Sequence, residues 1–263
     1  LVFEFFWILT GKNLPDKMSK MIRGKNAKGQ YRNVSKFRKN IMLFQVAVGL
    51  LATFLCITSG WLMVEKVFRV PYGSMILWIL SPVLFLRCIQ AVFLGYFQSE
   101  GSELPSAVSA VLRQLFYLGL GLLFLGIFRT YGEKVSLLLK KDDFTSMYGA
   151  MGIALGVLIS EILLLLFTFV IYRGSKSGKK ETESGMKGTD SGFHQIRSLV
   201  FGMAGDIFGQ ILLLLPLGFG LFLFQKNSAD IYTSIENYGV FSGRYFVAML
   251  LPAELFGGGI LPG

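Results

Sequence analysis

Long apolar runs, separated by clusters of glycine, proline and charge, dominate this sequence. They cover residues 1–11, 41–64, 72–98, 104–128, 148–172, 198–224 and 244–261. Most exceed the roughly 20 apolar residues that cross a bilayer as one helix. Because lipid offers the backbone no hydrogen-bond partner, each run has to be helical. Charged residues make up 16% of the chain, against about 25% in soluble domains. The sequence therefore predicts an all-α polytopic membrane protein with about seven transmembrane helices.

Both ends of the sequence fall inside apolar segments, which predicts a fragment of a longer protein. The stretch LVFEFFWILTG has no basic region before it, unlike a signal peptide. Residues 174–192, GSKSGKKETESGMKGTDSG, contain no aromatic side chain and are typical of a flexible linker. We therefore expect an N-terminal helical bundle at 1–173 with a truncated first helix, a cytoplasmic linker at 174–196, and the truncated start of a second bundle at 197–263.

Basic residues are distributed unevenly among the loops, and this predicts the orientation. Residues 12–39 carry ten Lys/Arg and one acidic residue, and residues 172–197 carry six more Lys/Arg, whereas the loops on the other side carry eight in total. The positive-inside rule places the two richest loops in the cytoplasm. Because the excess positive charge lies beside membrane helices, it indicates contact with membrane lipids rather than with nucleic acid.

The sequence lacks the usual signatures of a metal or catalytic site. Cys56 and Cys88 fall inside predicted spans, and the single histidine, His194, lies in a polar loop. No metal, cofactor or catalytic residue is expected, and the chain is predicted not to be an enzyme. An integral membrane glycosyltransferase or acyltransferase would need acid–base groups in sizeable loops, and the outer segments 133–147 and 225–243 offer neither histidine nor a suitable carboxylate pair.

Five charged residues lie inside the predicted spans, where charges are usually functional. They are Arg87, Arg113, Glu161, Asp206 and Glu254. Helical spacing extends three of them into polar stripes: Arg87 with Gln90 and Gln98, Arg113 with Ser106, Ser109 and Tyr117, and Asp206 with Gln210. Two alternatives stay open, because the stripes could line a hydrated cavity or form interhelical pairs that fix the packing.

The chemistry of a cavity would follow from these charges. Arginine offers a planar fork of donors that suits phosphate and carboxylate groups. A desolvated carboxylate can take up or release a proton, so Glu161 and Asp206 are candidate sites for a coupling proton or monovalent cation. The sequence thus favours an anionic headgroup as substrate.

The stretch 95–116, GYFQSEGSELPSAVSAVLRQLF, resembles a segment of the polysaccharide biosynthesis and stage V sporulation protein B-like family, which is related to the lipid II flippases of the multidrug/oligosaccharidyl-lipid/polysaccharide exporter superfamily. The matching residues are Gly95, Tyr96, Phe97, Gln98, Pro105, Ala107, Ser109 and Gln114. Residues 18–40, MSKMIRGKNAKGQYRNVSKFRKN, resemble the first cytoplasmic loop of that family. Leu94 and Arg113 depart from it, since the family has arginine and glutamate there.

The resemblance implies two six-helix bundles that surround a central cavity with alternating access. It implies a flippase that moves a lipid-linked oligosaccharide or cell-wall precursor across the cytoplasmic membrane of a bacterium. Arg87, Gln90, Gln98, Ser109, Arg113 and Gln114 would then contact the cargo. The alternative is a multidrug/cation antiporter of the same superfamily. An acidic cavity without arginine would favour that alternative, so Arg87 and Arg113 argue against it.

Overall fold

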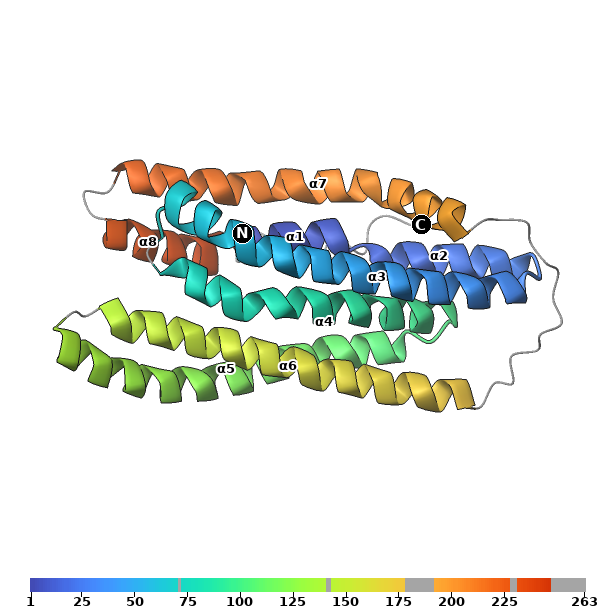
Figure 1. The fold of residues 1–263 in the computed structure, drawn as a ribbon, viewed down its shortest axis with the longest axis horizontal. Helices are drawn as coiled ribbons and strands as arrows, with labels where there is room; N and C mark the ends of the chain where they lie inside the picture. The colour runs from blue at the N-terminus through green and yellow to red at the C-terminus, as the bar shows by residue number, and fades with distance from the viewer. Residues whose placement is uncertain (71, 141–142, 178–191, 228–230, 247–263) are drawn as a thin grey trace.

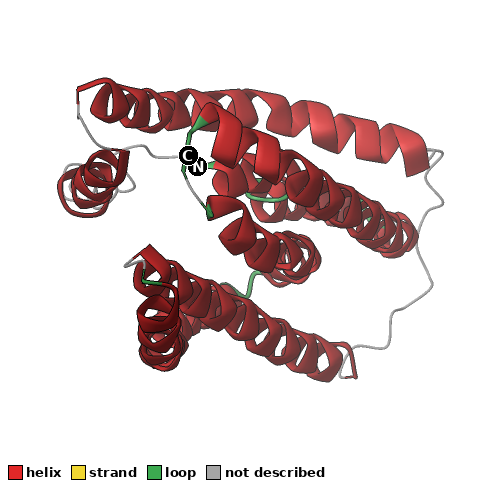
Figure 2. Cartoon of the chain, turned by 60° about the vertical axis from the view of Figure 1, so that its left-hand side comes forward, coloured by secondary structure: helices red, strands yellow, loops and turns green. Residues whose placement is uncertain are grey.

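The computed structural model describes residues 1–70, 72–140, 143–177, 192–227 and 231–246, and this part of the chain is helical without strands. The long helices run side by side along one axis (Figure 1), and Figure 2 shows that only short turns connect them where the connections are described. Helix α7 lies on one side of the assembly, α1 to α4 form the middle, and the α5–α6 hairpin lies on the other side (Figure 1).

Five helices are long and apolar enough to cross a membrane, which confirms the predicted fold class. They are α3 (Tyr31–Gly60) with its π-helical continuation η1 (Trp61–Val67), α4 (Gly73–Ser99), α5 (Leu104–Leu139), α6 (Asp143–Ser177) and α7 (Gly192–Asn227). Each contains one predicted apolar segment. The predicted segment at 244–261 lies almost wholly outside the described residues, as does Glu254; η2 (Phe241–Phe246) covers only its start.

The basic stretch at 12–39 was expected to be a loop, and this expectation is wrong. After α1 (Val2–Thr10) a short break leads into α2 (Leu14–Ala27), and α3 begins at Tyr31. Pro15 occupies the first turn of α2, where its missing N–H is not needed. Leu14, Met18 and Ile22 recur at four-residue spacing and are buried, so α2 is an amphipathic helix whose apolar face packs onto the protein.

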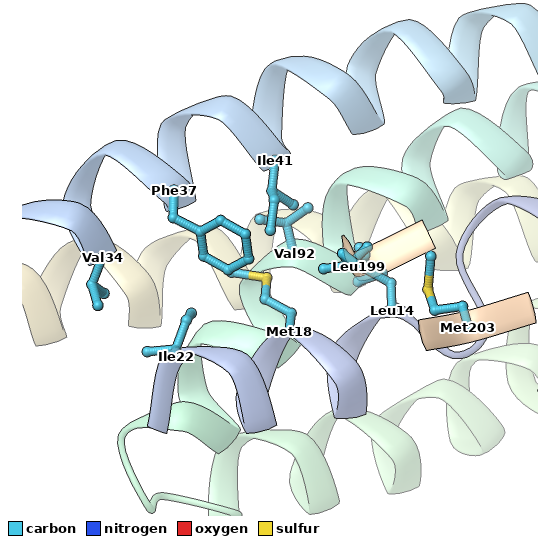
Figure 3. Close-up of a cluster of buried hydrophobic side chains, with 10 residues drawn as sticks. Leu14, Met18, Ile22, Val34, Phe37, Ile41, Val92, Leu199 and Met203 are labelled. Atoms are coloured by element: carbon cyan, nitrogen blue, oxygen red, sulfur yellow. The ribbon is translucent and has the colours of Figure 1, made fainter. Parts of the chain in front are cut away.

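The buried face of α2 belongs to an apolar core cluster that lies beside the basic stretch at 12–39. Figure 3 shows Met18 and Ile22 of α2 facing Phe37 and Ile41 of α3. Ala91 and Val92 of α4 and Leu199 and Met203 of α7 complete this cluster. Helix α2 therefore joins α3 and α4 to α7.

The outer loops predicted at 133–147 and 225–243 are also largely helical where the structure describes them. Helix α5 continues through Arg129, whose side chain pairs with Glu133 one turn later, and it ends where Lys140 adopts a left-handed conformation (φ 53°). Helix α8 (Ile231–Val240) occupies much of the second region. Likewise α6 extends to Ser177 and α7 begins at Gly192, while 178–191 lies outside the described residues. The division into two bundles stays a prediction.

Glycine allows α5 and α6 to approach closely over most of their length. A Cβ atom built on Gly152 would lie 2.5 Å from the Phe124 carbonyl oxygen, and one on Gly156 would lie 2.8 Å from the Leu120 carbonyl oxygen. Small residues permit such backbone contact between membrane helices. In contrast, α5 has few backbone contacts with α4, so side chains bridge those two helices.

Candidate functional site

The buried charges of the membrane-spanning region meet where α4, α5 and α6 come together. Helix α4 contributes Arg87 and Gln90, which lie three residues apart and therefore share a helix face. Helix α5 contributes Arg113 and Tyr117, four residues apart, and α6 contributes Glu161. We call these five residues the charged cluster. Only 1% of the Glu161 side chain is exposed, against 14% of Arg87 and 25% of Arg113.

A single carboxylate oxygen of Glu161 organises the charged cluster. Arg87 Nε donates to Glu161 Oε1 at 2.7 Å, and the Tyr117 hydroxyl donates to the same oxygen. Arg87 Nη2 in turn donates to the Tyr117 hydroxyl at 2.5 Å. A buried carboxylate needs an opposite charge and hydrogen bonds to remain ionised. The three side chains therefore stabilise one another across all three helices.

Arg113 is held more loosely than Arg87. Its Nη2 donates to Gln90 Oε1 at 2.5 Å, and its Nε lies 3.4 Å from Glu161 Oε1 without hydrogen-bond geometry. Within the described residues, Glu161 Oε2, Gln90 Nε2 and Arg113 Nε are buried atoms without a hydrogen-bond partner. With two arginines and one carboxylate, the charged cluster has a net charge of +1.

Aromatic rings of α1 cover the Arg87 side of the charged cluster. The guanidinium carbon lies 5.2 Å from the centre of the Phe3 ring, 5.4 Å from that of Trp7 and 6.0 Å from that of Tyr117. At these distances the rings attract a cation. Sequence reasoning missed Phe3 and Trp7, although their four-residue spacing places both on one helix face.

The other predicted site residues lie elsewhere. Gln98 is at the far end of α4, where its amide nitrogen lies 3.2 Å from both the Pro15 carbonyl oxygen and Asp16 Oδ1 of α2, in the amide orientation that satisfies these groups. Ser109 is buried, and its hydroxyl donates to the carbonyl of Pro105 in its own helix at 2.6 Å. Gln114 is exposed on α5.

Asp206 belongs to the contact between α7 and α2. Its carboxylate lies 2.9 Å from Lys17 Nζ, and 48% of its side chain is exposed. One turn further, the amides of Gln210 and Asn13 exchange two hydrogen bonds, at 2.7 and 3.3 Å. The structure therefore does not bring Asp206 together with Glu161, and its role in coupling stays a prediction.

The motif at 95–98 holds α2 against α4. A Cβ atom on Gly95 would lie 3.2 Å from the Pro15 Cα and 3.1 Å from the Met18 sulfur. The guanidinium of Arg23 donates to the backbone carbonyl of Gln98, with a distance of 3.1 Å from Nε. Cations favour the carbonyl end of a helix. This part of the motif thus has a packing role that sequence reasoning did not identify.

No metal-binding group of three or more His, Cys, Asp or Glu side chains occurs among the described residues. Cys56 and Cys88 are buried and free. The chemical capacity of the charged cluster therefore lies in its charges and in its unfilled hydrogen-bond donors.

The chain is similar to stage V sporulation protein B of Bacillus subtilis (strain 168). The two are 26% identical over 206 residues, which cover 76% of this chain and 36% of that protein. This similarity confirms the resemblance drawn from the sequence. The chain spans only about a third of the length of this relative. No protein-family model and no solved structure matches the chain.

Proposed function

We propose that this relative of stage V sporulation protein B is part of a bacterial flippase that moves a lipid-linked oligosaccharide or cell-wall precursor across the cytoplasmic membrane. The observation that carries the proposal is the charged cluster, a net positive group buried among three membrane-spanning helices. Charges are rare within the bilayer and usually mark the path of a substrate or ion. The basic end with α2 would face the cytoplasm.

The charges of the cluster suit an anionic cargo. A lipid-linked precursor carries phosphate groups next to its sugar, and arginine binds phosphate through charge-assisted hydrogen bonds. Alternating access between two bundles would expose the cargo headgroup to each membrane face in turn, while its lipid tail stays in the bilayer. Such a transporter needs no catalytic residue of its own.

The antiporter alternative receives less support. A cation bound at Glu161 would lie close to both arginines, because Arg87 is 2.7 Å and Arg113 3.4 Å from Oε1 of this carboxylate, and only its Oε2 lacks a hydrogen-bond partner among the described residues. Binding a second cation beside two arginines would be opposed by like-charge repulsion.

Transport of a fluorescent lipid-linked precursor by the full-length protein in proteoliposomes tests the proposal. We expect Arg113→Ala to lower the transport rate at least about tenfold, since a charge-assisted hydrogen bond contributes about 1.5–3 kcal/mol. Arg87→Ala should lower it as well, because it leaves Glu161 without its 2.7 Å partner and removes the net positive charge of the cluster. Arg129→Ala is the matched control, because that arginine is 66% exposed and pairs only within its own helix. Normal transport by both cluster variants, at normal protein levels, would reject the proposal.

A further inference from the structure

We propose that the two arginines of the charged cluster have different roles. Arg113, together with Gln90, binds a phosphate-type oxyanion. Arg87 is a positioning residue that neutralises the charge of Glu161 and holds its side chain in place. The nature of the anion rests on the proposed function, in which the cargo carries phosphate. The division of labour rests on the contacts of each arginine. It assigns an anion site to one named pair of side chains on α4 and α5.

Arg87 already has an acceptor at both Nε and Nη2. Its guanidinium binds Glu161 and Tyr117 through hydrogen bonds of 2.7 and 2.5 Å and lies against the rings of Phe3 and Trp7. Its positive charge is cancelled by the nearest carboxylate. An anion approaching Arg87 would have to displace Glu161, which is itself 1% exposed and cannot move into solvent.

Arg113 and Gln90 carry the donors that remain unused. Arg113 makes its one described hydrogen bond to Gln90 Oε1. That bond fixes the amide of Gln90, because with its oxygen facing Arg113 the nitrogen has to be the free end. Gln90 Nε2 and Arg113 Nε are both buried without hydrogen-bond partners, and a buried unsatisfied donor destabilises the protein. An oxyanion with several acceptor oxygens would satisfy both donors and meet the uncancelled positive charge.

Access also differs between the two arginines. The aromatic residues of α1 cover Arg87, whereas 25% of the Arg113 side chain is exposed. Helices α4 and α5 meet mainly through side chains rather than through close backbone contact. The exposed part of Arg113 is therefore the part of the cluster that a ligand can contact without separating the tightly packed α5–α6 hairpin.

Anion-dependent thermal stability of the purified full-length protein tests the inference without a transport assay. The melting temperature is measured in detergent against sodium pyrophosphate, with sodium chloride at equal ionic strength as reference. Two double variants have the same cluster charge of +1: Arg87→Gln with Glu161→Gln, and Arg113→Gln with Glu161→Gln. We expect the first to keep a pyrophosphate-induced rise with a half-saturating concentration within about threefold of the parent, and the second to weaken binding at least about tenfold.

Two single variants keep the inference testable if a double variant does not fold. Gln90→Leu leaves the Arg87–Glu161 pair intact and should weaken pyrophosphate binding about tenfold, because it removes one donor. Glu161→Gln raises the cluster charge from +1 to +2 and should tighten binding. Arg129→Gln should change nothing.

The outcomes separate the site from the function. The reverse ranking of the two double variants, or no pyrophosphate effect on the parent protein, would overturn the assignment of Arg113. Pyrophosphate binding that follows the expected ranking, combined with normal precursor transport by the Arg113 variants, would uphold the anion site and reject the proposed function.

Discussion

Replacing Arg87 by methionine should destabilise the protein far more than replacing Arg87 and Glu161 together. The single change leaves Glu161, 1% exposed, without its 2.7 Å partner. Removing one member of a buried pair costs about 3–5 kcal/mol. Loss of the contacts with Phe3 and Trp7 adds roughly 0.5–2 kcal/mol.

Two contacts reduce this cost. Tyr117 still donates to Glu161, and Arg113 remains 3.4 Å from the same oxygen. We therefore expect a net loss of about 3 kcal/mol for Arg87→Met. In the double variant, Arg87→Met with Glu161→Leu, neither member of the pair is left alone, and an apolar replacement of a buried pair is often neutral or stabilising. Arg113 loses a carboxylate neighbour at 3.4 Å, but its side chain is 25% exposed. We expect that double variant to lose less than about 1 kcal/mol.

Reversible unfolding of the purified protein in mixed micelles measures both variants and the single Glu161→Leu variant. The double-mutant cycle then gives the coupling free energy between the two side chains. A coupling energy below about 0.5 kcal/mol, with Arg87→Met costing less than about 1 kcal/mol, would refute the reasoning, because it would mean that Glu161 is solvated or neutral without Arg87.

Three further predictions concern the packing around the charged cluster. Gly152→Ala should lower the free energy of unfolding by about 1–3 kcal/mol in the same assay, because the added Cβ would lie 2.5 Å from the Phe124 carbonyl oxygen. Gly126→Ala is the control and should not lower the free energy of unfolding, because the space around Gly126 is open. Gly95→Leu should detach α2, seen as faster trypsin cleavage within α2; unchanged cleavage would contradict the packing role of the motif. Asp206→Ala should cost less than about 1 kcal/mol, since its pair with Lys17 is partly exposed; a loss above 2 kcal/mol would show a stronger contact.

The membrane spans could be predicted from the sequence because length and hydropathy determine them. Helix ends could not, because charged residues such as Arg129 and Glu133 can continue a helix beyond the bilayer by pairing one turn apart. Helix α2 was interpreted as a loop because it contains many lysines and arginines. The spacing of Leu14, Met18 and Ile22 nevertheless indicates an amphipathic helix.

The sequence predicts which site residues share a face of one helix, but not which residues of different helices contact each other. The spacing of Arg87 and Gln90 correctly placed them on one face. Gln98 shares that face, but eleven residues at 1.5 Å each put it about 16 Å further along the axis, so it reaches α2 instead. Whether Arg87 would meet Glu161 or Asp206 depends on the depth and rotation of separate helices, which one sequence does not specify.

The ion pair between Arg87 and Glu161 also has a consequence for biosynthesis. Its members are 74 residues apart in the chain, and a ribosome adding about 5–20 residues per second makes the second about 4–15 seconds after the first. During that interval α4 has to enter the bilayer with an unmatched arginine, at an insertion cost of about 2.5–3.5 kcal/mol. The leucines, isoleucines and valines of α4 provide the driving force that keeps it inserted until α6 emerges from the ribosome.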